Sequence, residues 1–149
     1  MSDNGATVFA ILFIPGFIGM WVLVSRVLSL LGWSQLAERH KAVADPSPQA
    51  KRLYWSSMSV GPGLMSVSYS SCINAWIDND GVYFRPSLMF RLFHPMLFLP
   101  WNQMQSVENR PLIIFRRTVL QMHGGTPAIS AHGRLGKEIL KRWQQLKPQ

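Results

Sequence analysis

Few side chains in this sequence are of a kind that performs catalysis. Its 149 residues include one cysteine, Cys72, and four histidines. A cysteine thiolate beside a histidine base is a nucleophile, and grouped histidines are ligands for a transition metal. Cys72, however, lies in a run typical of a half-buried strand, where a thiol packs against its neighbours. We therefore predict that Cys72 is not catalytic.

Motifs that hold a cofactor or activate water are missing from the sequence. We find no phosphate-binding loop, no paired cysteines at zinc spacing, no H-E-x-x-H helix and no G-x-S-x-G elbow. His94, His123 and His132 could gather as metal ligands, because His123 and His132 lie near the ends of consecutive predicted strands. The alternative is that they are ordinary surface or turn histidines. We predict a protein that is not an enzyme and has no catalytic, cofactor-binding or metal-binding residue.

The charge balance narrows the class of partner. Fifteen basic and seven acidic residues give a formal net charge of +8. The basic residues are scattered and no recognition motif accompanies them, so we expect no nucleic-acid binding. A positive domain suits the anionic inner leaflet of a membrane. A single cysteine allows no internal disulfide, which fits a reducing compartment.

An uncharged apolar segment lies near the amino terminus, ahead of Cys72 and the histidines in the sequence. No charged side chain occurs between Asp3 and Arg26. A helix over those 22 positions is about 33 Å long, enough to cross a hydrocarbon core of about 30 Å. We predict one membrane-spanning helix. Its expected lipid-facing residues are Phe9, Leu12, Phe13, Phe17, Trp21 and Leu23.

Three alternatives compete with a spanning helix. A cleaved signal sequence needs a basic start and a shorter apolar run, and Ala42-Val43-Ala44 lies far beyond this one. A buried helix of a soluble protein needs more chain around it than is present here. A re-entrant hairpin would break at Pro15-Gly16, although spanning helices also tolerate such a kink.

Flanking charges predict the orientation of the span. Only Asp3 precedes it, whereas Arg26, Arg39, Lys41, Lys51 and Arg52 follow it. Basic residues stay on the cytoplasmic side, so we expect the amino terminus outside and the rest of the chain inside, at a bacterial inner membrane.

Several residues near the end of the span leave more than one interpretation. Trp21 and Trp33 suit either the lipid headgroups or ordinary packing. The small residues Ser25, Ser29 and Gly32 are of the type that supports contact with another helix.

Proline positions divide the rest of the chain. Pro46 and Pro48 should end the helix by Ala44, which gives a helical segment 1–44, a linker 45–50 and one domain 51–149. Residues 65–77 alternate with a period of two, and a turn at Asp78-Asn79-Asp80-Gly81 joins them to a second strand at 82–85. We predict further short strands at residues 88–93, 96–99, 112–116, 118–123 and 128–132.

The carboxy-terminal segment predicts a helix instead. Leu135, Ile139, Trp143 and Leu146 recur at spacings of four, four and three, which places them on one face. A single amphipathic helix after a run of strands should cover the open end of a barrel, with Trp143 as its main contact.

Four segments carry a family resemblance. They are residues 77–85 with the Asp80-Gly81 turn, residues 99–107 beginning Leu99-Pro100-Trp101, residues 117–122, and the closing helix with Trp143. Together with the upstream anchor they resemble the bacterial pleckstrin-homology-like domains of small membrane proteins. The resemblance implies a bent, partly open barrel of about seven antiparallel strands plugged by the carboxy-terminal helix. It also implies a binding or scaffold module that is not an enzyme. The basic pattern of phosphoinositide-binding relatives is missing, so inositol-lipid recognition does not carry over.

One segment is more apolar than a barrel strand requires. Residues 88–101 are apolar on both strand faces, which fits either a contact surface beside Arg85 and Arg91 or a loop folded over the core. Arg116 and Arg117 begin a second basic group, which is either a contact or a solvated face. We predict contact with a partner or lipid at Arg85, Phe90, Arg91, Phe93, His94, Met96, Phe98, Arg116 and Arg117.

These observations favour a membrane-anchored, non-catalytic binding or scaffold protein. We expect an accessory subunit of a membrane protein complex, which contacts its partner through the span and the cytoplasmic domain. The alternative function is recognition of anionic lipid headgroups at the inner membrane surface.

Overall fold

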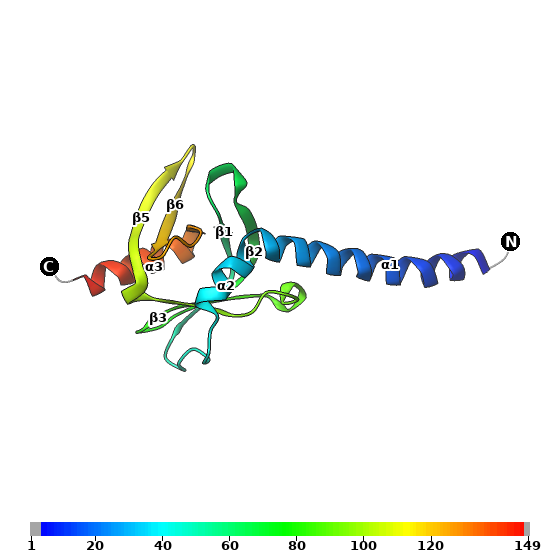
Figure 1. Cartoon of the computed structure of the whole chain (residues 1–149), viewed down its shortest axis with the longest axis horizontal. Coiled ribbons are helices and arrows are strands. Elements are labelled where there is room, and N and C mark those ends of the chain that lie inside the picture. The colour runs from blue at the N-terminus through cyan, green and yellow to red at the C-terminus, as the bar shows by residue number, and fades with distance from the viewer. Residues whose placement is uncertain (1–3, 148–149) are drawn as a thin grey trace.

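The computed structural model describes residues 4–147, except for the side chains of Leu64 and Leu112. The outermost positions of the predicted segments, residues 1–3 and 148–149, lie outside the described part. A long amino-terminal helix leads into an antiparallel sheet, and a second helix ends the chain (Figure 1). The helices are α1 (Asn4–Leu28), α2 (Ser34–His40) and α3 (Gly133–Leu146). The strands are β1 (Lys51–Val60), β2 (Val67–Ile77), β3 (Gly81–Pro86), β4 (Leu97–Pro100), β5 (Met104–Leu112), β6 (Phe115–Met122) and β7 (Ile129–His132).

Helix α1 projects from the rest of the molecule as a single rod (Figure 1). It runs through Pro15 without a break, so the alternative of a hairpin at Pro15-Gly16 is wrong. A π-helical turn, Ser29–Trp33, joins α1 to α2, and the combined helix Asn4–His40 is long and apolar enough to cross a membrane. A signal sequence near an amino terminus passes the same test of length and composition.

The second part of this helix packs into the β domain. Trp33 and Leu36 are fully buried, which settles the position of Trp33 in favour of packing. The small residues Ser25 and Ser29 are buried too, and Gly32 lies so close to β1 that a Cβ would be 3.1 Å from Val60 Cγ1. These small residues therefore let the helix approach its own domain.

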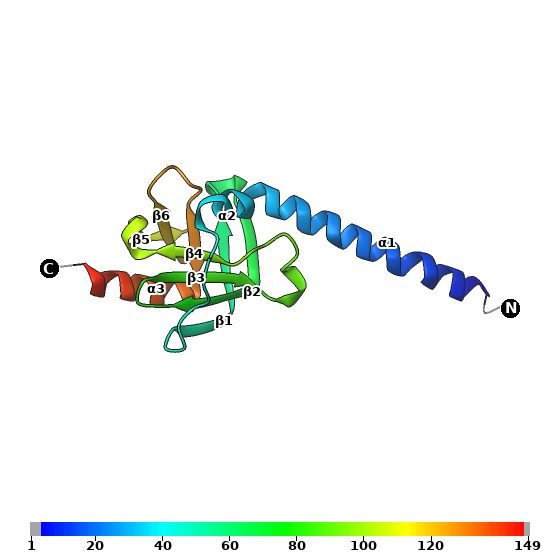
Figure 2. The same cartoon turned by 60° about the horizontal axis from the view of Figure 1, so that its bottom comes forward.

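One seven-stranded sheet forms the domain. Its strand order is β4-β3-β2-β1-β7-β6-β5, all pairs are antiparallel, and the sheet curls into a half-barrel (Figure 2). Helix α3 packs against β1, β2, β5, β6 and β7 and covers the concave face. The strand count, the antiparallel pairing and the closing helix confirm the predicted architecture.

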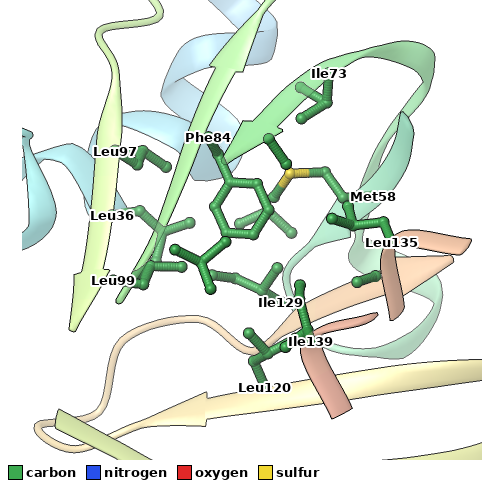
Figure 3. Packing of buried hydrophobic residues seen from close by; sticks show 14 of the residues in the cluster. Leu36, Met58, Ile73, Phe84, Leu97, Leu99, Leu120, Ile129, Leu135 and Ile139 are labelled. Carbon is green, nitrogen blue, oxygen red and sulfur yellow. The ribbon is translucent and has the colours of Figure 1, made fainter. Parts of the chain in front are cut away.

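The core combines residues from every layer. Figure 3 shows Phe84 among side chains of β1, β4 and β7, with Leu36 contributed by α2 and Leu135 and Ile139 by α3. Leu135 and Ile139 are buried, Trp143 is half-buried beside Trp101, and Leu146 is exposed. The predicted helix face is therefore confirmed over its first two turns.

Strand β1 has no counterpart among the predicted strands, although it is one of the longest. The register with β2 shifts between Leu53 and Ser56 and again between Ser56 and Met58. Trp55 has a φ of 56°, and Met58, Ser59 and Val60 are all buried in succession. These bulges remove the two-residue alternation by which a strand is recognised.

Two predicted strands are wrong. Residues 88–93 form a short 3-10 helix, Leu88–Phe90, and a turn, because Phe93 has a φ of 61° that ends any extended run. Residues 112–116 are split by a hairpin turn at Ile113 and Ile114 between β5 and β6. Pro111 does not end β5, since this strand lies at the edge of the sheet, where a missing donor costs least.

Candidate functional site: two exposed apolar surfaces

Cys72 and His94, whose side chains are of a kind that could take part in catalysis, are both buried in the domain. Cys72 is buried, and this burial raises the pKa of its thiol, which keeps it protonated and a poor nucleophile. His94 is 3% exposed; its Nδ1 donates to the Leu92 carbonyl at 2.7 Å, and its Nε2 forms a hydrogen bond with the Tyr69 hydroxyl at 3.1 Å. The structure therefore buries His94 inside the domain.

The other two histidines of the possible metal set lie apart. In the pairing of β6 with β7, His132 is opposite Arg117, whereas His123 follows the far end of β6. His132 instead pairs with Ser59 Oγ at 2.9 Å. Among residues 4–147, no group of three or more His, Cys, Asp or Glu side chains is arranged to hold a metal ion.

The predicted lipid-facing side chains lie along the free length of α1. Phe9, Leu12, Phe13, Phe17 and Leu23 are exposed, and the rings of Phe9, Phe13 and Phe17 stack in sequence at 5.4 and 6.0 Å. Trp21 differs because it is partly covered by residues that follow β3. Exposure of so many large apolar side chains on one rod is unusual for a surface in water.

The first apolar surface, residues 88–93, is called the helix-side loop. It lies between β3 and β4 and projects on the same side of the domain as α1 in both views (Figures 1 and 2). Leu88, Met89, Leu92 and Phe93 are exposed, by 77, 69, 47 and 41% respectively. Phe90 is partly buried, with its ring 5.1 Å from that of Trp21.

Side chains of the combined helix Asn4–His40 donate hydrogen bonds to backbone carbonyls in and just after this loop. Trp21 Nε1 donates to the carbonyl of Met89 at 3.2 Å, and Ser29 Oγ donates to that of Phe93 at 2.6 Å. Trp33 Nε1 donates to the carbonyl of Pro95, just after the loop, at 2.9 Å. The loop therefore has a fixed position relative to the helix.

The segment that looked apolar on both faces divides into two parts. Its first part is the helix-side loop, and its second part is β4 with Trp101, in which Leu97, Leu99 and Trp101 are buried in the core. Phe98 points to the other face and stacks on Tyr83 with ring centroids 4.5 Å apart. The second part therefore belongs to the core, whereas the first part is exposed, and its contact with a partner or lipid stays a prediction.

Arg85 and Arg91 line a common hollow of about 360 Å³ beside the helix-side loop. Residues 42–45 and 94–96, including Met96, form the rest of its wall. Arg91 is exposed and its Nε donates to the Pro86 carbonyl at 3.5 Å. Asp45 also lines the hollow, so its formal charge is only one positive unit.

The second apolar surface, residues 113–115, is called the hairpin tip. It ends the β5–β6 hairpin, which stands across the direction of α1 (Figure 1). Ile113, Ile114 and Phe115 are exposed by 101, 83 and 75%. The sequence prediction missed this surface, because the four apolar residues 112–115 looked like part of one strand. The absence of alternation before Arg116-Arg117 is the signal that would have indicated it.

The backbone of the hairpin tip is strained. Ile113 has a φ of 41°, in the left-handed region that two-residue hairpin turns fill with Gly, Asn or Asp. A β-branched residue with positive φ is a clear outlier, and Ile113 is too exposed for packing to explain it. Such strain at an exposed position makes the hairpin tip a candidate binding surface.

Basic side chains adjoin the hairpin tip. Arg116 is exposed, and Arg117 is partly buried opposite His132. Arg110, on the facing strand, forms an exposed ion pair with Glu108 at 3.0 Å. Of the predicted contact residues, the structure thus places Arg85, Phe90, Arg91, Phe93 and Met96 near the helix-side loop, Arg116 and Arg117 near the hairpin tip, and Phe98 near neither.

No protein-family model matches this chain, and no curated protein matches it in sequence. Inferences about its function therefore have to come from the arrangement described above.

Proposed function

We propose that this chain is a single-span, non-catalytic binding protein that serves as an accessory subunit of a membrane protein complex. In this proposal α1 spans a bacterial inner membrane with its amino terminus outside, and a pleckstrin-homology-like half-barrel lies on the cytoplasmic side. The charge distribution supports the orientation, because Arg26, Arg39 and Lys41 all follow the apolar part of α1. The curled seven-stranded sheet closed by α3 supports the family resemblance.

The hairpin tip is the observation that carries the proposal. It presents three large apolar side chains to solvent at a strained turn, beside Arg116 and Arg117. Exposed apolar residues with basic neighbours are typical of a protein-binding surface, where aromatic and aliphatic groups are buried and a polar rim surrounds them. Because the hairpin stands across the direction of α1, a partner in the same membrane would meet this surface from the side (Figure 1).

Site-specific photo-crosslinking in native membranes tests this function. A photoreactive residue at Ile114 should give a discrete adduct with one or a few membrane proteins, and the adduct should disappear when Phe115→Asp is added. The matched control is the same photoreactive residue at Gln121, an exposed position on β6 away from the tip. Equal labelling from both positions, or adducts insensitive to Phe115→Asp, would contradict the proposal.

Recognition of anionic lipid is the second candidate, and the hollow lined by Arg85 and Arg91 favours it. The full chain should then bind a soluble phosphatidylglycerol analogue when reconstituted in phosphatidylcholine nanodiscs, with binding that weakens as salt increases. Arg85→Gln with Arg91→Gln should abolish this binding, whereas Arg110→Gln near the hairpin should not. If neither variant loses binding, recognition of anionic lipid through this hollow is wrong.

A further inference from the structure

The helix-side loop lies at the level of the uncharged part of α1. Trp21 Nε1 contacts the Met89 carbonyl, and Trp21 precedes Arg26, the first charged residue after the apolar segment, by five positions. At about 1.5 Å per residue, five positions correspond to about 7.5 Å along the helix. Met89 therefore lies nearer to the predicted hydrocarbon than Arg26 does.

The side chains of the loop suit the boundary between headgroups and acyl chains. Leu88 and Met89 are the most exposed, and Leu92 and Phe93 follow. Arg91 is the one charged residue of the loop; its long side chain can keep the guanidinium among the headgroups while the stem stays apolar. Arg26 behaves similarly, with its guanidinium 5.1 Å from the centre of the Phe93 ring.

The loop also has the rigidity that a fixed depth requires. Trp21 holds its first half through the carbonyl of Met89, Ser29 holds its end through that of Phe93, and Trp33 holds the chain just after it through that of Pro95. Behind the loop, Trp33 packs edge-on against Tyr69 and His94 at 5.3 and 5.4 Å. Loop and helix therefore move as one unit, and the depth of α1 in the bilayer sets the depth of the loop.

We infer that residues 88–93 insert into the leaflet from which α1 emerges, with Leu88 and Met89 at the upper end of the acyl chains. The inference rests on the proposed membrane span of α1. It adds a second point of membrane contact, which fixes the tilt of the half-barrel and holds the hairpin tip at a defined height above the bilayer. The bilayer itself is thus the occupant of this apolar surface, through continuity with the lipid-facing side of α1.

Collision accessibility of spin labels in phosphatidylcholine nanodiscs tests the inference. Single cysteines replace Met89, Leu12 and Ile113 in turn in the full chain, with Cys72→Ala as background. All three positions are exposed, so the label displaces no core contact. We expect the labels at Met89 and Leu12 to collide with oxygen several-fold more, relative to a water-soluble nickel complex, than the label at Ile113 does.

The three labelled positions distinguish a failure of the loop insertion from a failure of the proposed membrane span. A label at Met89 that behaves like that at Ile113, while Leu12 remains in lipid, would overturn the inference and leave the membrane span intact. A label at Leu12 that is open to nickel would overturn the span and the inference together. A label at Met89 shielded from both oxygen and nickel would show contact with a second protein copy, which also contradicts insertion into lipid.

Discussion

The helix-side loop and the hairpin tip are both short, exposed and apolar, yet they are attached to the molecule in different ways. The loop is bound to the first helix through the carbonyls of Met89, Phe93 and Pro95. The hairpin tip extends from two strands that pair with each other, and only β6 continues into the rest of the sheet. The loop therefore shares the position of the helix, whereas the hairpin tip is free to meet a separate molecule.

Apolar composition alone therefore does not identify the partner of a surface. Both regions would look alike in a hydropathy profile. We propose lipid as the partner of the helix-side loop because of its hydrogen bonds to the helix and the height at which they occur. We propose a protein as the partner of the hairpin tip because Ile113 has a positive φ and the hairpin stands across the direction of α1 (Figure 1).

The largest expected effect is on the free energy of unfolding, which should depend much more on Trp33, at the base of the helix-side loop, than on the hairpin tip. Trp33→Ala should lower the free energy of unfolding by about 3–5 kcal/mol, because Trp33 is fully buried and its removal leaves a cavity. Phe115→Ala, the matched change at the hairpin tip, should cost less than about 0.5 kcal/mol, as exposed substitutions usually do. Chemical denaturation in detergent, followed by near-ultraviolet circular dichroism, measures both. Equal losses would mean that the hairpin tip is also a packing element.

A smaller effect tests the attachment of the loop. Ser29→Ala removes the hydrogen bond to the Phe93 carbonyl and should lower stability by about 1 kcal/mol. Hydrogen exchange of the loop amides should accelerate in this variant, while amides of β6 stay protected. Gln35→Ala, at an exposed position on α2, is the control and should change neither quantity. Unchanged exchange in Ser29→Ala would show that the loop does not depend on the helix.

A change of similar size but opposite sign tests the strain at the hairpin tip. Ile113→Gly should raise stability by about 1 kcal/mol, because relief of the positive φ, about 1–3 kcal/mol, outweighs the entropy cost of glycine, about 0.5–1 kcal/mol. The same variant should weaken the crosslink from Ile114. Thermal unfolding and adduct yield check the two parts. A destabilised Ile113→Gly variant would show that the turn is not strained.

The smallest effect concerns pH and the base of the helix-side loop. Burial lowers the pKa of His94, although its hydrogen bond to the Leu92 carbonyl opposes this. The unfolded chain, with a histidine pKa near 6.5, then takes up a proton more readily than the folded chain. Stability should therefore be retained above about pH 6.5 and fall as the pH drops below that value.

His94→Gln isolates this contribution, because glutamine does not titrate. The slope of melting temperature between about pH 7 and pH 5 should be shallower in His94→Gln than in the original chain. Some slope should remain, since burial and the nearby Arg117 also lower the pKa of His132. An identical slope in both proteins would mean that His94 is not neutral in the folded state.

Local patterns in the sequence predicted much of the fold. The alternation in β2, the Asp80-Gly81 turn and the apolar spacing of α3 each depend on neighbours within a few positions, so they could be recognised without the structure. Strand β1 could not, because its bulges interrupt the alternation at Trp55. The predicted strand at residues 88–93 failed because its carbonyls bind a helix and not another strand.

The candidate surfaces were predicted only in part. Arg91 and Phe93 belong to the helix-side loop and Arg85 lies beside it, but His94 is buried behind it. Ile113 and Ile114 were not selected, because strand-favouring residues give no sign that the chain reverses between them.

A long apolar helix, a mainly β domain and an amphipathic closing helix follow from the sequence alone, since the spacing of residues along the chain specifies each of them. The burial of Trp33, the attachment of one apolar loop to the helix and the separation of the other follow only from the tertiary structure, because the contacts between the helix and the loop segment join residues 62 to 68 positions apart. Such pairs are brought together by the curl of the sheet, which no local pattern specifies.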